Sequence, residues 1–497
     1  MSRISTAAGQ RLRAANVWPL VLVCLGTFGV ASVAHAQDAN ALPSAPVPQV
    51  ASSSSSTRFA GGVTVPQATP GALALGLDDA VERSLHGNLN MQLALQNTRA
   101  VRGQVSALTN NLLPNMTADL TTGTQMINLA ALGFKPSSLA EFGFPPNSIN
   151  TIVKVDTTNA QLSLNQQIFN APALYLLAAA RNAERSAEMT WLQAQGDVTQ
   201  AVATQYLKAL ADQAQIANTQ ALEKTDAEVL RQATASHDAG VGTNLDVLRA
   251  RVQLQTQQQA VINAENAFDK DKIQLNRLIG LPADQELTLT DTAPYAELEQ
   301  MPLDKALALA YTRRKDLLGL EAQMDVAVKT QKAIKYEHVP VLSFGGYYGV
   351  LGETHGLYHG DFAAQGNLQV PLFNEGQLRG EHEVAAAQMI GLKQQMASLK
   401  VTIDQQIRAS MLDVQSSSDL VKVARSNVDL ATQELQDATD RFAAGVDDNL
   451  PVVQAQATLA SAQSQLVSTL YQFNASKLAL ARNTGVVETQ YKVYLGR

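Results

Sequence analysis

Cysteine is almost absent from this chain: Cys24 is the only one among 497 residues. It follows Val23, at a position where a lipoprotein signal requires a small residue, so lipidation of Cys24 is not expected. With a single cysteine no disulfide can form within the chain, and a metal site built from several thiolates is excluded.

Basic clusters and long apolar segments are also missing. The net charge is −7, and no run of lysines and arginines offers the electrostatic footprint that nucleic acids require. Beyond the N-terminal region there is no stretch of about 18 apolar residues, so the sequence predicts no membrane-spanning helix there. These absences argue against nucleic-acid binding and against a helical membrane protein.

The sequence also lacks the common catalytic and cofactor motifs. It contains no G-x-S-x-G elbow, no glycine-rich phosphate loop and no H-E-x-x-H helix. His355 and His359 are four residues apart, but they lie in the glycine-rich stretch GETHGLYHG, which predicts a surface loop between two strands. We therefore predict no catalytic residue, no cofactor and no metal site.

The first 36 residues have the pattern of a secretory signal peptide. Three arginines precede an apolar run from Val17 to Val33, and the small-residue sequence AHA ends at Ala36. A transmembrane helix is the competing interpretation, but the run is short and a cleavage-like site ends it. Its removal deletes three arginines and no acid, so the net charge becomes −10 (−7 − 3). Residues 37–72, rich in proline and serine, predict a disordered leader.

What the chain does have is an internal duplication. AGVGTNLDVLRA begins at Ala239, and the similar AGVDDNLPVVQA begins at Ala444, 205 residues later (444 − 239). Apolar residues then recur every seven positions in both copies, which predicts long helices that supercoil against neighbours. The matched positions are Val247, Leu254, Val261, Phe268 and Leu275 in the first copy and Val452, Leu459, Leu466, Phe473 and Leu480 in the second.

The duplication extends upstream of these heptads. LDDAVERSLHGN from Leu77 resembles LDKALALAYTRR from Leu303, and the first copy holds 22 extra residues (offset 226 − 204), mostly in a loop at Leu129–Asn150. Each half is predicted to form a helix, a proline-marked break, two extended segments, a very long helix, a glycine turn and a long helix. The predicted organisation is a first repeat at 73–280, a linker at 281–302, a second repeat at 303–486 and a C-terminal tail at 487–497.

Apolar residues alternate with small or polar ones in the extended segments. The clearest segments are Leu342–Val350 and Phe362–Val370, with shorter counterparts at Met116–Leu120 and Ala160–Leu164. A period of two over about nine residues predicts a strand with one apolar face, long enough to cross a bilayer when tilted. Val153 and Val155 are out of phase with the last segment, so a bulge or a strand end is expected there. Two soluble hairpins packed on helices are the alternative.

Helix length favours the membrane interpretation. After Pro172 no proline and only one glycine, Gly196, occur before Ala235, which predicts a helix of about 95 Å at 1.5 Å per residue. The second copy has a similar segment at 377–443. Four strands cannot close a barrel, and open sheet edges are not viable in lipid. Several chains must then share one barrel: two would supply eight strands and three would supply twelve.

The ordered duplication resembles the TolC-type outer membrane efflux proteins. The resemblance rests on the signal peptide, the order of elements, the Phe169-Asn170 and Phe373-Asn374 steps into the long helices, and the glycine turn followed by NLDVL. It covers about residues 73–486. It implies a mainly α-helical fold with a membrane β-barrel: a homotrimer with four barrel strands per chain and a long α-helical barrel. It also implies contact with outer membrane lipid, a periplasmic adaptor and an inner-membrane transporter.

The two glycine turns are the candidate functional site. In the resembled family they lie at the periplasmic tip, where the entrance closes and the adaptor docks. Gly240 and Gly445 fit the left-handed position that ends a long helix, and Asn244 and Asn449 fit the caps of the returning helices. The predicted tip and docking residues are Gly240, Asn244, Leu245, Asp246, Gly445, Asn449 and Leu450.

Acidic residues beside the turns have two interpretations. Asp246, Asp447 and Asp448 could form an acidic ring at the periplasmic entrance of a trimer. They could equally be ordinary helix-end residues, since acids stabilise a first helical turn. Leu245-Asp246-Val247 matches the tip motif of the family, whereas Pro451 stands where the second copy should have an acid.

Three classes of function follow from these observations. The leading one is a passive outer membrane conduit for efflux or secretion, with a long periplasmic extension. The alternative is a periplasmic coiled-coil adaptor or scaffold without a pore, which would leave the amphipathic strands without a role. A secreted enzyme has no supporting constellation of residues. The exported substrate, the adaptor and the pump are not specified by the sequence.

Overall fold

The computed structural model describes residues 61–62, 70–132, 150, 152–292, 295–299 and 301–496. The predicted signal peptide, most of the predicted leader and most of the loop at Leu129–Asn150 lie outside these residues. The chain from Ser44 onward belongs to one compact unit. Within the described part, no helix is long and apolar enough to cross a membrane.

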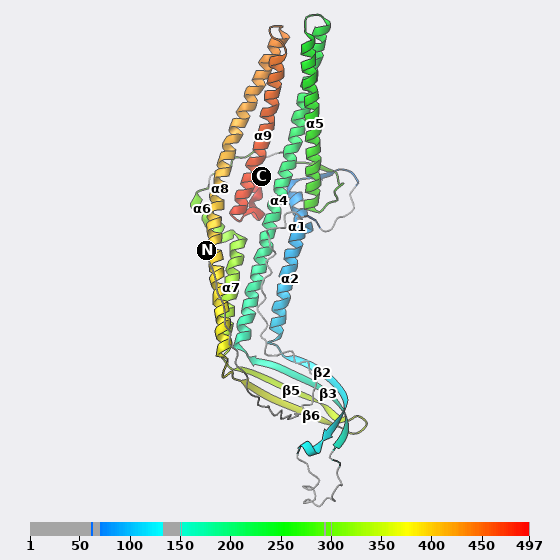
Figure 1. Cartoon of the computed structure of the whole chain (residues 1–497), viewed down its shortest axis with the longest axis vertical. Coiled ribbons are helices and arrows are strands. Elements are labelled where there is room, and N and C mark those ends of the chain that lie inside the picture. The colour runs from blue at the N-terminus through cyan, green and yellow to red at the C-terminus, as the bar shows by residue number, and fades with distance from the viewer. Residues whose placement is uncertain are drawn as a thin grey trace, which may run out of the picture. The chain divides into compact units, whose positions relative to one another are not determined.

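The order of elements repeats once along the chain (Figure 1). Each half has two short helices in series, two long strands, a very long helix, a tight turn and a returning helix. The first half consists of α1 (Leu77–Gly87), α2 (Leu89–Asn110), β2 (Asn115–Asn128), β3 (Ile152–Phe169), α4 (Ala171–Asp238) and α5 (Asn244–Ile279). The second half consists of α6 (Leu303–Arg313), α7 (Lys315–Lys335), β5 (Val341–Glu353), β6 (Tyr358–Gln369), α8 (Glu375–Ala443) and α9 (Leu450–Asn483).

The long helices α4 and α8 contain 68 and 69 residues, in agreement with the predicted lengths. At 1.5 Å per residue each is about 100 Å long. The start of α4 is determined locally, because the Asn170 side chain accepts a hydrogen bond from the backbone N–H of Ala173 (3.0 Å). Pro172 lies in the first turn, where a missing N–H costs no hydrogen bond.

The shorter helices are interrupted at two positions that sequence periodicity does not reveal. Asn88 separates α1 from α2 with an extended backbone, and its side chain caps α2 by accepting from Asn90 N. Arg314 separates α6 from α7, and its buried guanidinium donates to Asp316, to Gln406 and to the carbonyl of Asn483. A buried arginine with this many acceptors holds the interruption in place.

The helices form a single layer in which neighbours in space are often distant in sequence. In the part that carries the glycine turns, α4 packs on α5 and α9, and α9 packs on α8, which gives the order α5–α4–α9–α8. The heptad prediction is confirmed, because Val247, Leu275, Val452, Phe473 and Leu480 are all buried. The outer helices α5 and α8 are therefore the two edges of the layer (Figure 1).

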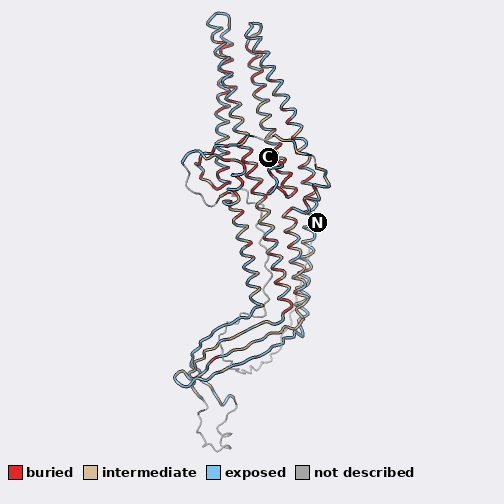
Figure 2. Tube along the Cα trace, turned by 180° about the vertical axis from the view of Figure 1, so that it is seen from behind, coloured by how far each residue is buried: buried red, intermediate tan, exposed pale blue. Residues whose placement is uncertain are grey.

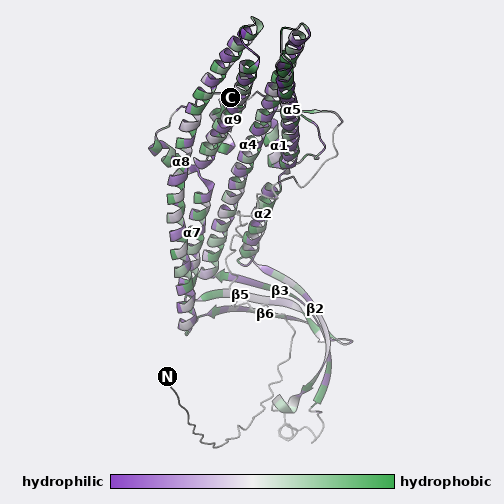
Figure 3. Cartoon of the chain, turned by 45° about the horizontal axis from the view of Figure 1, so that its top comes forward, coloured by the Kyte–Doolittle hydropathy of each residue, from purple (hydrophilic) through white to green (hydrophobic). Residues whose placement is uncertain are grey.

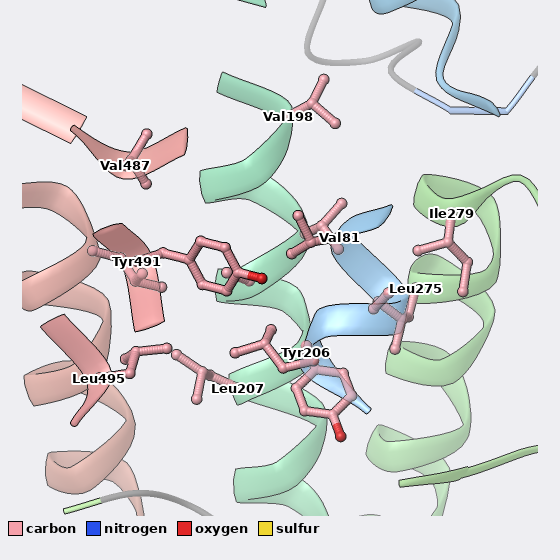
Figure 4. Packing of buried hydrophobic residues seen from close by; sticks show 14 of the residues in the cluster. Val81, Val198, Tyr206, Leu207, Leu275, Ile279, Val487, Tyr491 and Leu495 are labelled. Carbon is pink, nitrogen blue, oxygen red and sulfur yellow. The ribbon is translucent and has the colours of Figure 1, made fainter. Parts of the chain in front are cut away.

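The largest hydrophobic core lies where the returning helices end beside α4. Side chains from α1, α4, α5 and α10 (Val487–Leu495) converge there, as Figures 2 and 4 show. Tyr206 is fully buried, which confirms its prediction as a packing residue, and its hydroxyl donates to the carbonyl of Leu75 (2.9 Å). The segment from residue 487, predicted as a tail, contributes Val487, Tyr491 and Leu495 to this core.

Two segments predicted to be irregular also join this region. In the linker at 281–302, β4 (Leu287–Leu289) pairs in parallel with β1 (Leu73–Leu75). Within the predicted disordered leader, the N–H of Gly62 donates to the carbonyl of Arg277 (2.8 Å). These backbone contacts attach the linker to the first repeat.

The four long strands form one antiparallel sheet in the order β2-β3-β5-β6. The expected bulge or strand end at Val153 and Val155 is wrong. Pairing between β2 and β3 continues without a shift from Ile152 to Asn165, and those valines simply face the side opposite Leu162. The register irregularity falls instead between Gln167 and Phe169, where β3 pairs with β5.

Candidate functional site

The two predicted tip turns share one backbone conformation. Gly240 has φ +79° and Gly445 has φ +70°, which confirms the left-handed position expected for both. In the first turn the N–H of Val241 donates to the carbonyl of Ser236 (3.0 Å). In the second, the N–H of Val446 donates to the carbonyl of Arg441 (3.1 Å). The chain therefore reverses direction by the same hydrogen-bonded turn at both sites.

The cap of α5 differs from the prediction. Asn244 is not the capping residue, because Thr243 occupies that position and its hydroxyl accepts a hydrogen bond from the backbone N–H of Asp246 (3.2 Å). The Asp246 carboxylate in turn accepts from the N–H and the hydroxyl of Thr243. This reciprocal capping box satisfies two otherwise unpaired N–H groups at the start of the helix. Asn244 is the exposed first residue of α5.

The cap of α9 also differs from the prediction. Asn449 occupies the cap position, but its side chain forms no capping hydrogen bond there. Asp448 instead accepts from the backbone N–H of Leu450 (3.2 Å). The buried Asn449 amide reaches across to the other hairpin and donates to the carbonyl of Asp246 (2.8 Å). This residue therefore joins the two tips directly.

Each of the three predicted entrance acids has a polar partner within the chain. Asp246 is largely buried in its capping box. Asp447 forms an ion pair with Arg441 (2.7 Å), and Asp448 forms one with Arg249 of the first hairpin (3.3 Å). These contacts are the helix-end and pairing chemistry of the second interpretation, and the acidic ring remains a prediction.

Apolar side chains at the tips are unusually exposed. Val241 is 84% exposed and Val446 is 66% exposed, one in each turn. Leu245 and Leu248 in α5 and Leu450 in α9 add to this surface. Beneath it the two hairpins pack on each other through a small apolar cluster that includes Val229, Val247, Ala438 and Val452. The tips are thus a joined pair with an apolar outer surface.

One carboxylate is buried in the seam below the tips. Asp226 on α4 is 1% exposed, and its carboxylate accepts a long hydrogen bond from Gln253 of α5 (3.4 Å). Among the described residues its other oxygen has no hydrogen-bond partner. Burial raises the pKa of Asp226 from 3.8 to about 6.

This buried acid predicts a pH-dependent seam. Because its pKa is higher in the folded state, Asp226 should weaken the seam as the pH rises from about 4 through about 6, by up to about 3 kcal/mol. Asp226→Asn should therefore slow hydrogen exchange of residues 222–233 at pH 7 and remove its pH dependence. The exposed Asp238→Asn provides the control. Faster exchange in Asp226→Asn at pH 7 would show that the ionised carboxylate stabilises the seam.

The sheet has two chemically different faces. Directly paired residues share a face, so Met116, Leu120, Leu162, Tyr348 and Phe362 lie together on one side. Their exposed fractions range from 48% to 77% in this chain. The opposite face carries mainly serine, threonine, asparagine and glutamine, and Figure 3 shows apolar and polar residues interspersed along the strands. The predicted alternation is confirmed.

No candidate metal centre accompanies these features. Across the described residues, no group of three or more histidine, cysteine, aspartate or glutamate side chains could hold a metal ion. His355 lies in the turn between β5 and β6, and His359 lies within β6.

Comparison with known sequences identifies the protein class. The profile described as outer membrane efflux protein matches residues 80–281 and 306–486, which span both repeats. The chain belongs to the outer membrane efflux protein family. The TolC-type resemblance inferred from the duplication is thereby confirmed.

Relatives in the outer membrane efflux protein family are distant in sequence but match over most of their length. Outer membrane protein TolC of Escherichia coli (strain K12) is 22% identical over 410 residues, covering 78% of this chain and 82% of TolC. The alkaline protease secretion protein AprF of Pseudomonas aeruginosa is 25% identical over 439 residues, covering 84% of this chain and 86% of AprF.

Solved structures of outer membrane channels share the fold of this efflux-family chain. The open-state MtrE channel of Neisseria gonorrhoeae gives a TM-score of 0.68 at 16% identity, covering 90% of this chain and 98% of MtrE. The outer membrane protein VceC of Vibrio cholerae gives 0.66 at 17% identity, covering 82% and 96%. At these identities the similarity shows the fold alone.

Proposed function

We propose that this protein is one subunit of a homotrimeric outer membrane channel that passively conducts efflux or secretion substrates. In this proposal three copies contribute four strands each to a twelve-stranded barrel, and their helices form a periplasmic conduit. The observation that carries the proposal is the four-stranded sheet with one exposed apolar face, one polar face and two open edges.

The open edges are the reason to expect several copies. β2 and β6 are each paired on one side only in the described sheet. In lipid the unpaired N–H and C=O groups would cost several kcal/mol each, so the edges require partners. Pairing β2 of one copy with β6 of the next satisfies both edges and closes the sheet. The apolar face then contacts lipid and the polar face lines the lumen.

The helical layer has matching open edges. On α8 the apolar residues Val401, Leu412 and Val423 are exposed at intervals of eleven residues, and on α5 Ile262 and Ile273 repeat this spacing. An eleven-residue spacing keeps side chains on one face of a nearly straight helix. Because α5 and α8 lie at opposite edges of the layer, their stripes would meet between adjacent copies. The number three rests on the family resemblance.

We further propose that the paired tips dock a periplasmic adaptor that joins the channel to an inner-membrane transporter. The exposed Val241, Leu245, Val446 and Leu450 support this, since exposed apolar clusters mark interaction surfaces. The tips adjoin the far end of α4, which is about 100 Å from the sheet by helix length alone. A conduit of that length would place the tips well inside the periplasm.

The topology can be tested with single cysteines in the chain whose only cysteine lies in the predicted signal peptide. Cysteine at His355, in the exposed turn between β5 and β6, should react with an impermeant thiol reagent on intact cells. Cysteine at Ser138, outside the described residues, should react in the same way. Both segments should face the exterior if the strands cross the outer membrane.

Cysteine at Val241 is the matched control, because that tip residue is even more exposed but should face the periplasm. It should be labelled only after the outer membrane is permeabilised. If His355→Cys and Val241→Cys behave alike in intact cells, the channel proposal fails and a periplasmic scaffold becomes the better interpretation.

A further inference from the structure

The register aligns two carboxylates across the polar face of the sheet. Asp119 of β2 pairs with Gln161, Gln161 pairs with Gly349, and Gly349 pairs with Asp361 of β6. Because these positions form one row, Asp119 and Asp361 lie at the same level on the same face, one on each edge strand. Closing the sheet between copies would bring Asp119 of one copy toward Asp361 of the next.

Charge is segregated between the two faces. In the four long strands the polar face carries Asp119, Asp361 and Glu353 and no lysine or arginine. The only strand lysine, Lys154, lies on the apolar side, at the end away from the apolar residues, and its amino group is 3.9 Å from Asp156. The outward face is therefore balanced in charge, whereas the polar face is not.

The contacts of these acids leave their charge uncompensated. The hydroxyl of Thr117 donates to Asp119 (3.3 Å), and the phenol of Tyr347 donates to Asp361 (3.2 Å). Neither carboxylate forms an ion pair with a described residue, unlike Asp447 and Asp448 at the tips, which pair with arginines. A hydroxyl partner orients a carboxylate but does not neutralise it.

We propose that this row makes the channel prefer cations over anions, so that the barrel, and not the tip entrance, sets its charge selectivity. The inference rests on the proposed function, because the row becomes a ring only in a closed barrel. Three copies would place six carboxylates at one level of the lumen (three times Asp119 and Asp361). Fixed charges of one sign concentrate counter-ions and repel ions of like charge.

Ionic screening sets the range over which this preference acts. The Debye length is about 10 Å at 0.1 M salt and about 3 Å at 1 M salt. In dilute salt the potential of wall carboxylates therefore extends well into a wide lumen, and in concentrated salt it does not. The preference for cations should accordingly be largest at low ionic strength.

The test is the reversal potential of purified full-length channels in planar bilayers with unequal dilute KCl on the two sides. The parent channel should favour potassium over chloride. The double variant Asp119→Asn with Asp361→Asn should lower the permeability ratio by roughly twofold or more toward unity. Asp156→Asn is the matched control, since it removes a strand carboxylate from the outward face and should leave the ratio unchanged.

The outcomes separate this inference from the channel proposal. Absence of conducting oligomers from the parent protein would overturn the proposed function itself. Conducting channels whose ratio is the same in the parent and in the Asp119/Asp361 double variant would overturn the inference alone. A ratio that falls only when Asp447 and Asp448 are changed to asparagine would place selectivity at the tips and would also overturn it.

Discussion

Replacing Leu120 by arginine should prevent the protein from assembling as an inserted oligomer in the outer membrane. Leu120 lies on the apolar face of β2 and is 77% exposed in the single chain. A lipid-facing arginine near the middle of a membrane barrel costs about 2–4 kcal/mol, and a trimer would incur this cost three times, up to about 12 kcal/mol. The measurement is the amount of heat-sensitive oligomer on gels of purified outer membranes.

Thr121→Arg is the control, because Thr121 is the next residue in β2 and its side chain lies on the polar face. An arginine there would face water in the proposed barrel and should leave the oligomer intact. Equal loss in both variants would indicate that β2 tolerates no arginine for reasons of strand packing. Equal assembly of both would contradict the assignment of the apolar face to lipid.

Replacing Gly240 by proline should abolish transport while leaving the channel assembled in the membrane. Proline fixes φ near −65°, whereas Gly240 has φ +79°. The substitution also removes the N–H that donates to the carbonyl of His237 (2.9 Å). The rebuilt turn should displace Val241 and Leu245, the residues proposed to dock the adaptor. Accumulation of a fluorescent dye that the native system exports should rise to that of cells lacking the protein.

Gly240→Asn provides the matched control for this turn. Asparagine tolerates left-handed backbone better than other residues with a side chain, and no other atom lies within 4 Å of the position that its Cβ would occupy. It should retain most of the transport activity. If Gly240→Pro instead eliminates the assembled oligomer, the turn is needed for folding and the docking proposal loses its support. The same pair of changes at Gly445, with φ +70°, tests the second tip.

Much of the fold could be predicted because its signals are short-range. The heptads that include Val261 and Phe473 repeat within single helices, and the alternation around Tyr348 repeats within a single strand. A glycine such as Gly240 predicts a left-handed turn by its own steric freedom. The order of these signals, met twice, was sufficient to indicate the protein family.

The errors occurred where two local options were equally favourable. Asn244 and Thr243 are adjacent residues that can both cap a helix, and the capping box with Asp246 selects Thr243. Val153 and Val155 are apolar in either phase, and only the continuous pairing of β2 with β3 shows that they face the polar side. Arg314 breaks a helical pattern that residue propensities alone would continue.

The sequence by itself determined the secondary structure, the duplication and the two faces of each strand, because these depend on residues close together in the chain. Only the tertiary structure decided that Asn449 joins the tips through the carbonyl of Asp246 and that Asp119 and Asp361 share one row. Both partners in each case are more than 200 residues apart, so no local pattern encodes their contact. Their positions follow from the packing of one repeat against the other, in which hydrogen bonding and strand register select one arrangement.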